Sequence, residues 1–187
     1  GAKTALITTK GFRDLLEIGR QTRPSLYNIM EDKPETLVKR SLRKEISERV
    51  TAKGDILRDV DRDEVRAVLK ELKEQGVESI AVCFLFSFLN SRNEKIVEEC
   101  IKEVWPEAYY SVSSTILPEF REFERLSTTV INSYLGPRMK MYIHNLRQPI
   151  HEVGVTVEPY ITPSTGGVMS ISSTIQPPAQ TPLSWPT

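Results

Sequence analysis

The apolar residues of this chain fall into short uncharged runs that alternate with helical stripes. Residues 80–86 (IAVCFLF) form a run of seven apolar residues, which is typical of a strand covered on both faces. A helical stripe at 65, 68, 69 and 72 precedes this run, and a second stripe over 96–104 follows it. This β-α-β rhythm predicts an α/β fold in which helices pack on a sheet.

Weaker signals extend the pattern toward both ends of the chain. Residues 4–8 predict a buried strand, residues 12–18 a helix after Gly11, and residues 108–112 a further strand. Residues 42–50 alternate with nearly period two, and 56–57 follow a turn at 53–55. We therefore expect a mixed sheet with an inserted antiparallel β-ribbon.

Capping residues and breakers set the expected ends of the helices. Asp61 is a good N-cap and Glu64 has capping-box spacing, while Gly76 supplies the stop. A long helix is expected after residue 118, with an interruption at Gly136-Pro137. We also expect a strand at 155–161 and a glycine turn at 164–168. The predicted organisation is an α/β domain at 1–117, a helical segment with a strand at 118–169, and a weakly ordered Ser/Thr/Pro-rich tail at 170–187.

Composition narrows the class of protein. The chain has 187 residues with 25 basic and 25 acidic side chains, so its formal net charge is zero. Nucleic-acid grooves and polybasic membrane patches need clustered excess charge, and neither partner is expected. Cys83 and Cys100 lie at apolar positions and are interpreted as buried reduced thiols of a cytoplasmic protein, with a disulfide or a reactive thiol as the alternative. Because both ends of the sequence break off within the pattern, we expect a fragment of a longer protein.

Two stretches could carry chemistry, and neither is a metal site. His144 and His151 lie seven residues apart with no cysteine nearby, so no metal site is expected. At 164–167, Ser164, Thr165, Gly166 and Gly167 could present backbone N–H groups and hydroxyls to a phosphate, although a plain turn is the alternative.

The second stretch runs from Glu119 to Arg125 and packs five charges and two phenylalanines into seven residues. On a helix, Arg121 and Arg125 share a face and Glu122 lies three residues before Arg125. One interpretation is an ion-paired helix start with acids at the positive end of the dipole. The other is that Glu119, Glu122 or Arg125 faces a cleft and orients a substrate or nucleotide.

Longer blocks resemble one known family. Residues 4–21 (TALITTKGFRDLLEIGRQ) resemble a block of the hydantoinase A/oxoprolinase family, and 48–50 with Gly54, 80–87, 118–129 and 164–168 resemble further blocks in the same order. Asn93 stands where that family usually has His. The resemblance covers nearly all of the chain.

The resemblance implies an actin-like ATPase fold: two lobes, each with a ribonuclease-H-like sheet, with the nucleotide between them. It implies ATP-dependent action on a cyclic amide (hydantoin, 5-oxoproline) or carboxylation of a ketone, with ATP, a divalent metal (Mg or Mn) and a hydantoinase B-type subunit. By this resemblance, Ser164, Thr165, Gly166 and Gly167 line the nucleotide, and Glu119, Arg121, Glu122 and Arg125 line the cleft between lobes. Catalytic residues stay unassigned.

The chain also departs from the family pattern. The first phosphate loop of the family would precede residue 1, and its LSGPAGG stretch would follow the end. Residues 183–187 (LSWPT) resemble the start of that stretch, but Trp185 takes a Gly position and Thr187 an Ala position. We therefore expect this chain to be inactive alone, and a non-catalytic α/β interaction or assembly module is the alternative.

Overall fold

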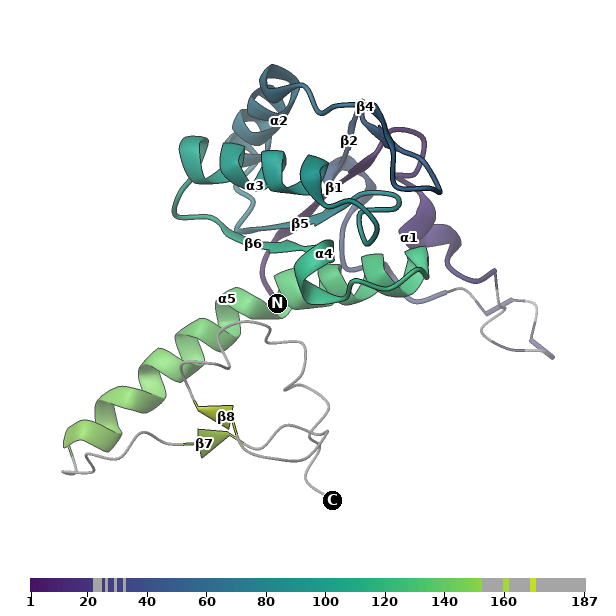
Figure 1. Ribbon diagram of the computed structural model, residues 1–187. Helices are drawn as coiled ribbons and strands as arrows, with labels where there is room; N and C mark the ends of the chain where they lie inside the picture. Colours follow the sequence, from purple (N-terminus) through teal and green to yellow (C-terminus); the bar gives the residue numbers. More distant parts are fainter. Residues whose placement is uncertain are drawn as a thin grey trace.

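A computed structural model describes residues 1–21, 25, 27–28, 30–31, 33–152, 160–161 and 169–170. Its centre is a four-stranded sheet of β1 (Thr4–Thr9), β2 (Arg43–Ile46), β5 (Ser79–Cys83) and β6 (Tyr109–Val112), in the order β2-β1-β5-β6 (Figure 1). The predicted α/β class is confirmed. The direction of the strands differs from the mixed sheet that we expected, because β1–β2, β1–β5 and β5–β6 all pair in parallel.

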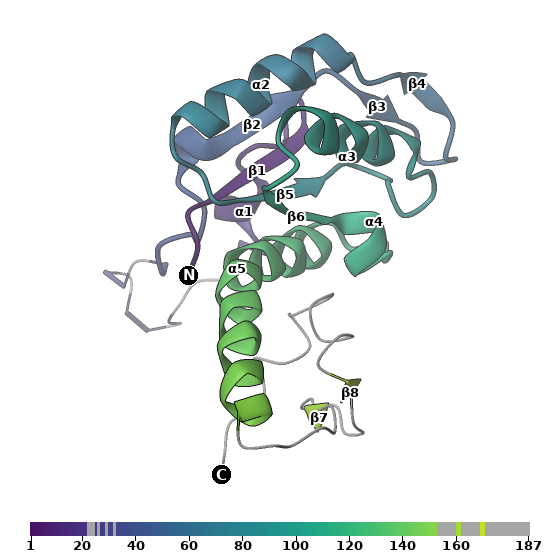
Figure 2. The ribbon, with the colours of Figure 1, turned by 90° about the vertical axis from the view of Figure 1, so that its left-hand side faces the viewer.

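Helices cover both faces of this sheet. α2 (Arg62–Glu74) and α3 (Arg92–Val104) lie on one face, and α5 (Glu122–Glu152) runs across the other (Figures 1 and 2). Three short helices complete this part: α1 (Leu15–Ile18), η1 (Arg40–Leu42) and α4 (Ser113–Ile116). Parallel strands are joined by crossover connections, which place helices on the faces of the sheet. Because both faces are covered here, the central strands are apolar on both sides.

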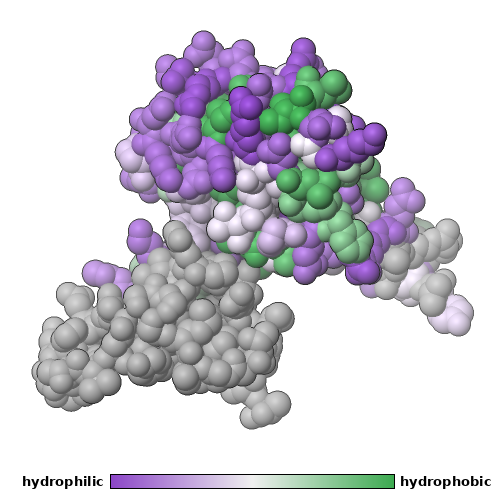
Figure 3. Space-filling model, in the orientation of Figure 1, coloured by the Kyte–Doolittle hydropathy of each residue, from purple (hydrophilic) through white to green (hydrophobic). Residues whose placement is uncertain are grey.

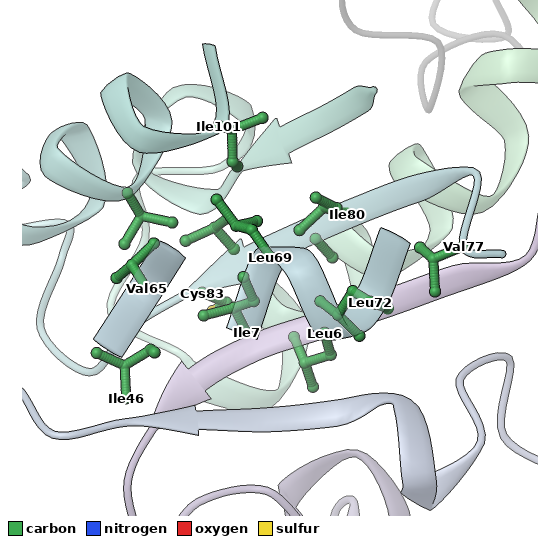
Figure 4. Close-up of a cluster of buried hydrophobic side chains, with 14 of the residues drawn as sticks. Leu6, Ile7, Ile46, Val65, Leu69, Leu72, Val77, Ile80, Cys83 and Ile101 are labelled. Atoms are coloured by element: carbon green, nitrogen blue, oxygen red, sulfur yellow. The ribbon is translucent and has the colours of Figure 1, made fainter. Parts of the chain in front are cut away.

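The core lies between α2, α3 and the sheet. Leu69 and Leu72 of α2 pack toward Ile7 of β1 and Ile80 of β5, with Ile101 of α3 beside them (Figure 4). All five side chains have no exposed surface. The stripes read from the sequence are therefore the buried faces of these helices.

The inserted ribbon is present but shorter than predicted. Residues 43–46 form β2 of the main sheet, and only β3 (Arg49–Val50) pairs antiparallel with β4 (Ile56–Arg58). The backbone N–H of Glu48 donates to the carbonyl of Ile46 at 2.9 Å, which turns the chain between β2 and β3. Prediction of one continuous strand over 42–50 was wrong because period-two spacing does not reveal this turn.

Two local signals at helix ends had different outcomes. Asp61 caps α2 as predicted, since its carboxylate accepts a hydrogen bond from the Asp63 N–H at 2.9 Å. The capping box was wrong: the Glu64 carboxylate accepts from the N–H of Ser47 at 3.1 Å and from its hydroxyl at 3.2 Å. The predicted helix at 12–18 is also shorter, since only Leu15–Ile18 is helical.

The long C-terminal helix does not break at Gly136-Pro137. α5 is continuous over 31 residues, and Figure 2 shows it bending along its length. A proline within a helix removes one backbone hydrogen bond and bends it, and tertiary packing can hold the helix together across that point. The packing here includes Tyr109, whose ring atoms occupy the place that a Cβ on Gly136 would take.

The last described strands are β7 (Tyr160–Ile161) and β8 (Met169–Ser170), which pair antiparallel. The predicted strand at 155–159, the turn with Ser164, Thr165, Gly166 and Gly167, and the tail at 171–187 lie outside the described residues. None of the helices in the described ranges combines the length and apolar character needed to cross a bilayer.

Candidate functional site

Polar side chains concentrate at the carboxyl edge of the sheet, where β1, β2, β5 and β6 all end. In open α/β sheets, ligands bind outside this edge. The buried side chains that follow the strand ends, together with residues of α3 and α5, are joined by hydrogen bonds. We call this set the carboxyl-edge network, and it consists of Thr9, Glu48, Ser87, Asn93, Glu94, Ser113 and Arg125.

Glu94 is the acceptor at the centre of the network. Its side chain has no exposed surface and accepts from the Phe84 N–H at 2.9 Å, the Ser113 hydroxyl at 2.6 Å and the Ser114 N–H at 2.9 Å. Ser87 and Ser113 share a further hydrogen bond of 3.0 Å between their hydroxyls. One carboxylate on α3 therefore fastens the end of β5 to the start of α4.

A second buried carboxylate, Glu48, joins the ends of β1 and β2 to α3. It accepts a short hydrogen bond from the Thr9 hydroxyl and another from the Asn93 side-chain amide at 2.8 Å. The Thr9 oxygen accepts in turn from the Leu85 N–H at 3.0 Å. Burial raises the pKa of Glu48, and the hydrogen bonds from Thr9 and Asn93 oppose that rise.

Arg125 is the buried cation of the network. Its guanidinium donates to the carbonyl of Phe84 at 3.0 Å and to that of Glu119 at 2.5 Å, and it lies over the Phe88 ring at 5.1 Å. Within the described ranges, Arg125 Nε and Asn93 Oδ1 are the buried side-chain atoms without a hydrogen-bond partner. The guanidinium thus holds the first turn of α5 against the end of β5.

The structure separates the members of the predicted 119–125 cluster. Glu119 and Arg121 are exposed, Glu122 is half-buried, and Arg125 has no exposed surface. Arg125 bonds to backbone carbonyls, so the Glu122–Arg125 ion pair of the first interpretation is not formed. Of the four predicted cleft residues, Glu119 and Arg121 are therefore the ones that present their side chains at an open surface.

Sequence reasoning assigned no site role to Glu48, Asn93 or Glu94. A signal existed for the last two, because the buried stripe of α3 at 97, 100 and 101 continues back to 93 and 94 at helical spacing. For Glu48 the signal was its place in the 48–50 block that resembles the family, and its burial depends on the turn after β2. Isolated polar residues of this kind become recognisable only when the fold brings them together.

The edge also carries apolar surface. Leu57 of β4, Leu89 after β5 and Phe120 just before α5 are 75%, 50% and 66% exposed. In Figure 3 the outer surface over α2 and α3 is mainly hydrophilic, and apolar side chains gather on the right, toward the carboxyl ends of the strands. Exposed apolar side chains that gather on one side of a protein are a common feature of interaction sites.

The cysteines and potential metal ligands add no reactive centre in the described ranges. Cys83 and Cys100 are free and buried, as predicted, and burial raises the pKa of the Cys83 thiol to about 12. No group of three or more His, Cys, Asp or Glu in the described part of the chain could hold a metal ion.

A parallel sheet between helix layers, with its polar network at the carboxyl edge, makes this chain an α/β lobe consistent with an actin-like, ribonuclease-H-like architecture. Comparison of the sequence with known families then identifies it further. The N-terminal region of hydantoinase/oxoprolinase matches residues 1–105, and the hydantoinase/oxoprolinase domain matches residues 125–187. The chain belongs to the hydantoinase/oxoprolinase family.

Curated relatives include an uncharacterized protein of Methanocaldococcus jannaschii, 39% identical over 95% of this chain and 26% of its own length. Caprolactamase subunit alpha of Pseudomonas jessenii is 29% identical over 90% of this chain and 24% of its own length. The acetophenone carboxylase gamma subunit of Aromatoleum aromaticum is 30% identical over 88% of this chain and 26% of its own length. The chain thus spans about a quarter of the length of these relatives.

Solved structures agree with this assignment. The crystal structure of ATP-dependent caprolactamase from Pseudomonas jessenii superposes with a TM-score of 0.84 at 29% identity, over 90% of this chain and 25% of that one. Nucleotide-free acetone carboxylase superposes with a TM-score of 0.80 at 22% identity, over 97% of this chain and 27% of that one. At this level of identity, the similarity supports the fold only.

Proposed function

We propose that this chain forms part of an ATP-dependent enzyme that opens a cyclic amide such as a hydantoin, 5-oxoproline or a related lactam. The observation that carries the proposal is the superposition on ATP-dependent caprolactamase with a TM-score of 0.84, together with the family match over residues 1–105 and 125–187. Carboxylation of a ketone is the second candidate, which the likeness to the acetophenone carboxylase gamma subunit favours.

Chemistry explains why such a reaction would consume ATP. Transfer of the γ-phosphoryl group of ATP to the amide oxygen makes the carbonyl carbon more reactive toward water. After water adds, the ring C–N bond breaks with the nitrogen taking up a proton, and hydrolysis of the resulting acyl phosphate releases phosphate. The protein then has to position the reactants and neutralise the charge on the phosphate. We propose that Arg121, which is exposed at the start of α5, faces that charge, with Glu119 beside it orienting the substrate.

The carboxyl-edge network would position these residues rather than touch the ligand. Arg125 binds the carbonyl of Glu119, and Glu94 holds the backbone of Phe84 to which Arg125 also binds. A change in either buried group would move the start of α5. Such supporting contacts decide how accurately a site is held.

The remaining expectations for the parent enzyme are part of the same proposal. Ser164, Thr165, Gly166 and Gly167 would contact the nucleotide. Mg or Mn would accompany ATP, and the described residues contain no group of three or more His, Cys, Asp or Glu that could bind such an ion by itself. The exposed apolar surface at the carboxyl edge supports apposition of a second lobe, and a hydantoinase B-type subunit is the proposed partner. The free buried cysteines suit a reducing cytoplasm.

A chimera tests the proposal. This chain would replace the matching quarter of caprolactamase subunit alpha, and ADP formation would be measured with caprolactam, 5-oxoproline, hydantoin, or acetone plus bicarbonate. We expect ADP formation that depends on a cyclic amide, none from the 187-residue chain alone, and at least a tenfold loss in Arg121→Ala. Arg138→Ala is the matched control, because Arg138 is an exposed arginine of α5, the helix that Arg121 directly precedes.

Two results would decide against the proposal. ADP formation that depends only on the ketone would favour the second candidate. A folded chimera that consumes no ATP with any substrate, beside an active parental caprolactamase, would favour a non-catalytic module. ATP hydrolysis by the isolated chain would contradict the expectation that it is inactive alone.

A further inference from the structure

The four-stranded sheet has two edge strands, β2 and β6, and a groove runs along each of them. The groove at β6 has a volume of about 410 Å³, and all four residues of the strand, Tyr109–Val112, line it. An edge strand presents unpaired N–H and C=O groups, to which another strand can add. The groove therefore lies where a fifth strand of the sheet would run.

Both helix layers form walls of this groove. On the α3 side, the Tyr110 hydroxyl donates to Glu98 at 3.1 Å, and Glu98 pairs with Lys102 at 2.7 Å. On the α5 side, the Asn132 amide donates to the Ser111 hydroxyl at 2.8 Å. Figure 1 shows β6 between these layers. A strand laid beside β6 would thus be covered on both faces, as the other strands are.

The chemistry of the two edges differs. β2 has the sequence RKEI, with Lys44 paired to Glu71 at 2.6 Å and Arg43 paired to Glu17 at 2.9 Å. Charged side chains are a common device that protects an edge from further pairing. β6 has the sequence YYSV and carries no charge. The charged residues of β2 are consistent with a sheet edge at which no further strand pairs, whereas β6 lacks such charges.

The length of the related proteins indicates where a strand that pairs with β6 would come from. Curated relatives are about four times as long as this chain, which covers 26% and 24% of two of them. We propose that the β6 edge is a strand-addition site, paired with a strand from the part of the hydantoinase/oxoprolinase polypeptide that lies outside the matched quarter. The incoming strand would carry apolar residues toward Ile116 on one face and polar residues toward Glu98 and Lys102 on the other.

Hydrogen exchange of the isolated chain and of the chimera with caprolactamase subunit alpha tests this site. We expect those amides of Tyr109–Val112 that point away from β5 to exchange at least tenfold more slowly in the chimera, while the amides of Arg43–Ile46 stay unchanged. Thr115 and Ser41 are exposed hydroxyl residues that line the β6 and β2 grooves respectively. Thr115→Trp should abolish the added protection by filling the groove, and Ser41→Trp should leave it intact.

Protection at Arg43–Ile46 instead, or no added protection at Tyr109–Val112 in a folded chimera, overturns the proposal. Protection of β6 in the isolated chain that rises with its concentration would assign the edge to a second copy and overturn it as well. A second measurement needs no chimera. In the caprolactamase crystal structure, the strand that superposes on β6 should be hydrogen-bonded to a strand from outside the matched quarter, and a solvent-exposed edge there would refute the site.

Discussion

Glu94→Gln tests whether the carboxyl-edge network holds the fold together. The Glu94 carboxylate accepts from three donors, the Phe84 N–H, the Ser113 hydroxyl and the Ser114 N–H, and contacts no solvent. Glutamine has almost the same shape, but an NH₂ group replaces one acceptor oxygen. In either orientation of the amide, that NH₂ group faces a backbone N–H, which leaves a buried donor without a partner.

The expected cost follows from these contacts. A hydrogen bond to a charged group contributes about 1.5–3 kcal/mol, and an unsatisfied buried donor costs about 1–3 kcal/mol. We therefore expect Glu94→Gln to lower the free energy of unfolding by about 3 kcal/mol, a large part of the roughly 5–15 kcal/mol typical of a domain. With a urea m-value of about 1–3 kcal/mol/M, the midpoint would fall by roughly 1–3 M.

Urea unfolding followed by circular dichroism measures this shift. Glu98→Gln is the matched control, because Glu98 lies one turn further along α3, is 28% exposed, and pairs with Lys102 at i, i+4. The hydrogen bond that Glu98 accepts from the Tyr110 hydroxyl can be kept by the glutamine oxygen. Such a pair contributes only about 0.3–0.5 kcal/mol. Equal midpoints for the two variants would refute the reasoning, since the buried carboxylate would then be no more important than the solvated one.

Three further predictions concern buried groups. Burial raises the pKa of Glu48 above its ordinary value of 4.5, so its contribution to stability is intact below pH 4.5 and is lost as the pH rises through the folded-state pKa. The urea midpoint of Glu48→Gln should therefore rise relative to the wild-type midpoint between pH 4 and pH 7. A difference between the two midpoints that does not change with pH would contradict this. Gly136→Ala should lower the free energy of unfolding by about 1–3 kcal/mol, measured by thermal unfolding, because the added methyl group meets the Tyr109 ring. This loss of stability should vanish in a Tyr109→Ala background. An unchanged or higher Tm of Gly136→Ala would count against this packing. Because the pKa of Cys83 is raised to about 12, its thiol should not react with a disulfide reagent at pH 8 until urea unfolds the chain, and rapid labelling of the native protein would be inconsistent with its burial.

Periodicity predicted the layers of the fold well. The stripes at 65–72 and 97–101 became the buried faces of α2 and α3, and the apolar run at 80–86 located β5. These signals succeed because spacing along the chain reports which side chains must leave water together. Periodicity did not predict the order and direction of the strands, because these depend on which crossover helix packs against which face of the sheet.

The candidate site was harder to predict. The 119–125 cluster was recognised from its charge, but the sequence did not reveal that Arg125 binds backbone carbonyls inside the protein while Arg121 stays exposed. Charge alone does not distinguish a buried structural arginine from one that meets a ligand. Only tertiary contacts separate the two, because both kinds of residue can start a helix.

The local predictions that failed are concentrated in two places. β5 ends at Cys83 rather than at residue 86, and Glu94 and Arg125 bind the N–H and carbonyl of Phe84 directly after it. Glu64 leaves its helix start to bind Ser47, which also follows a strand of the same edge. Where side chains compete successfully for backbone groups, short-range rules fail, and natural proteins tolerate such conflicts mainly at functional or strained positions.

The second place is the β6 edge. The expected helix break at Gly136-Pro137 does not occur, and Gly136 there receives the ring of Tyr109 from β6. A side chain at residue 136 would push this ring into the groove or force α5 away from the sheet. A glycine that weakens a helix is thus compensated by a tight contact under the edge strand. The same contact fixes the ring of Tyr109 in the wall of the groove, beside the space that a fifth strand requires.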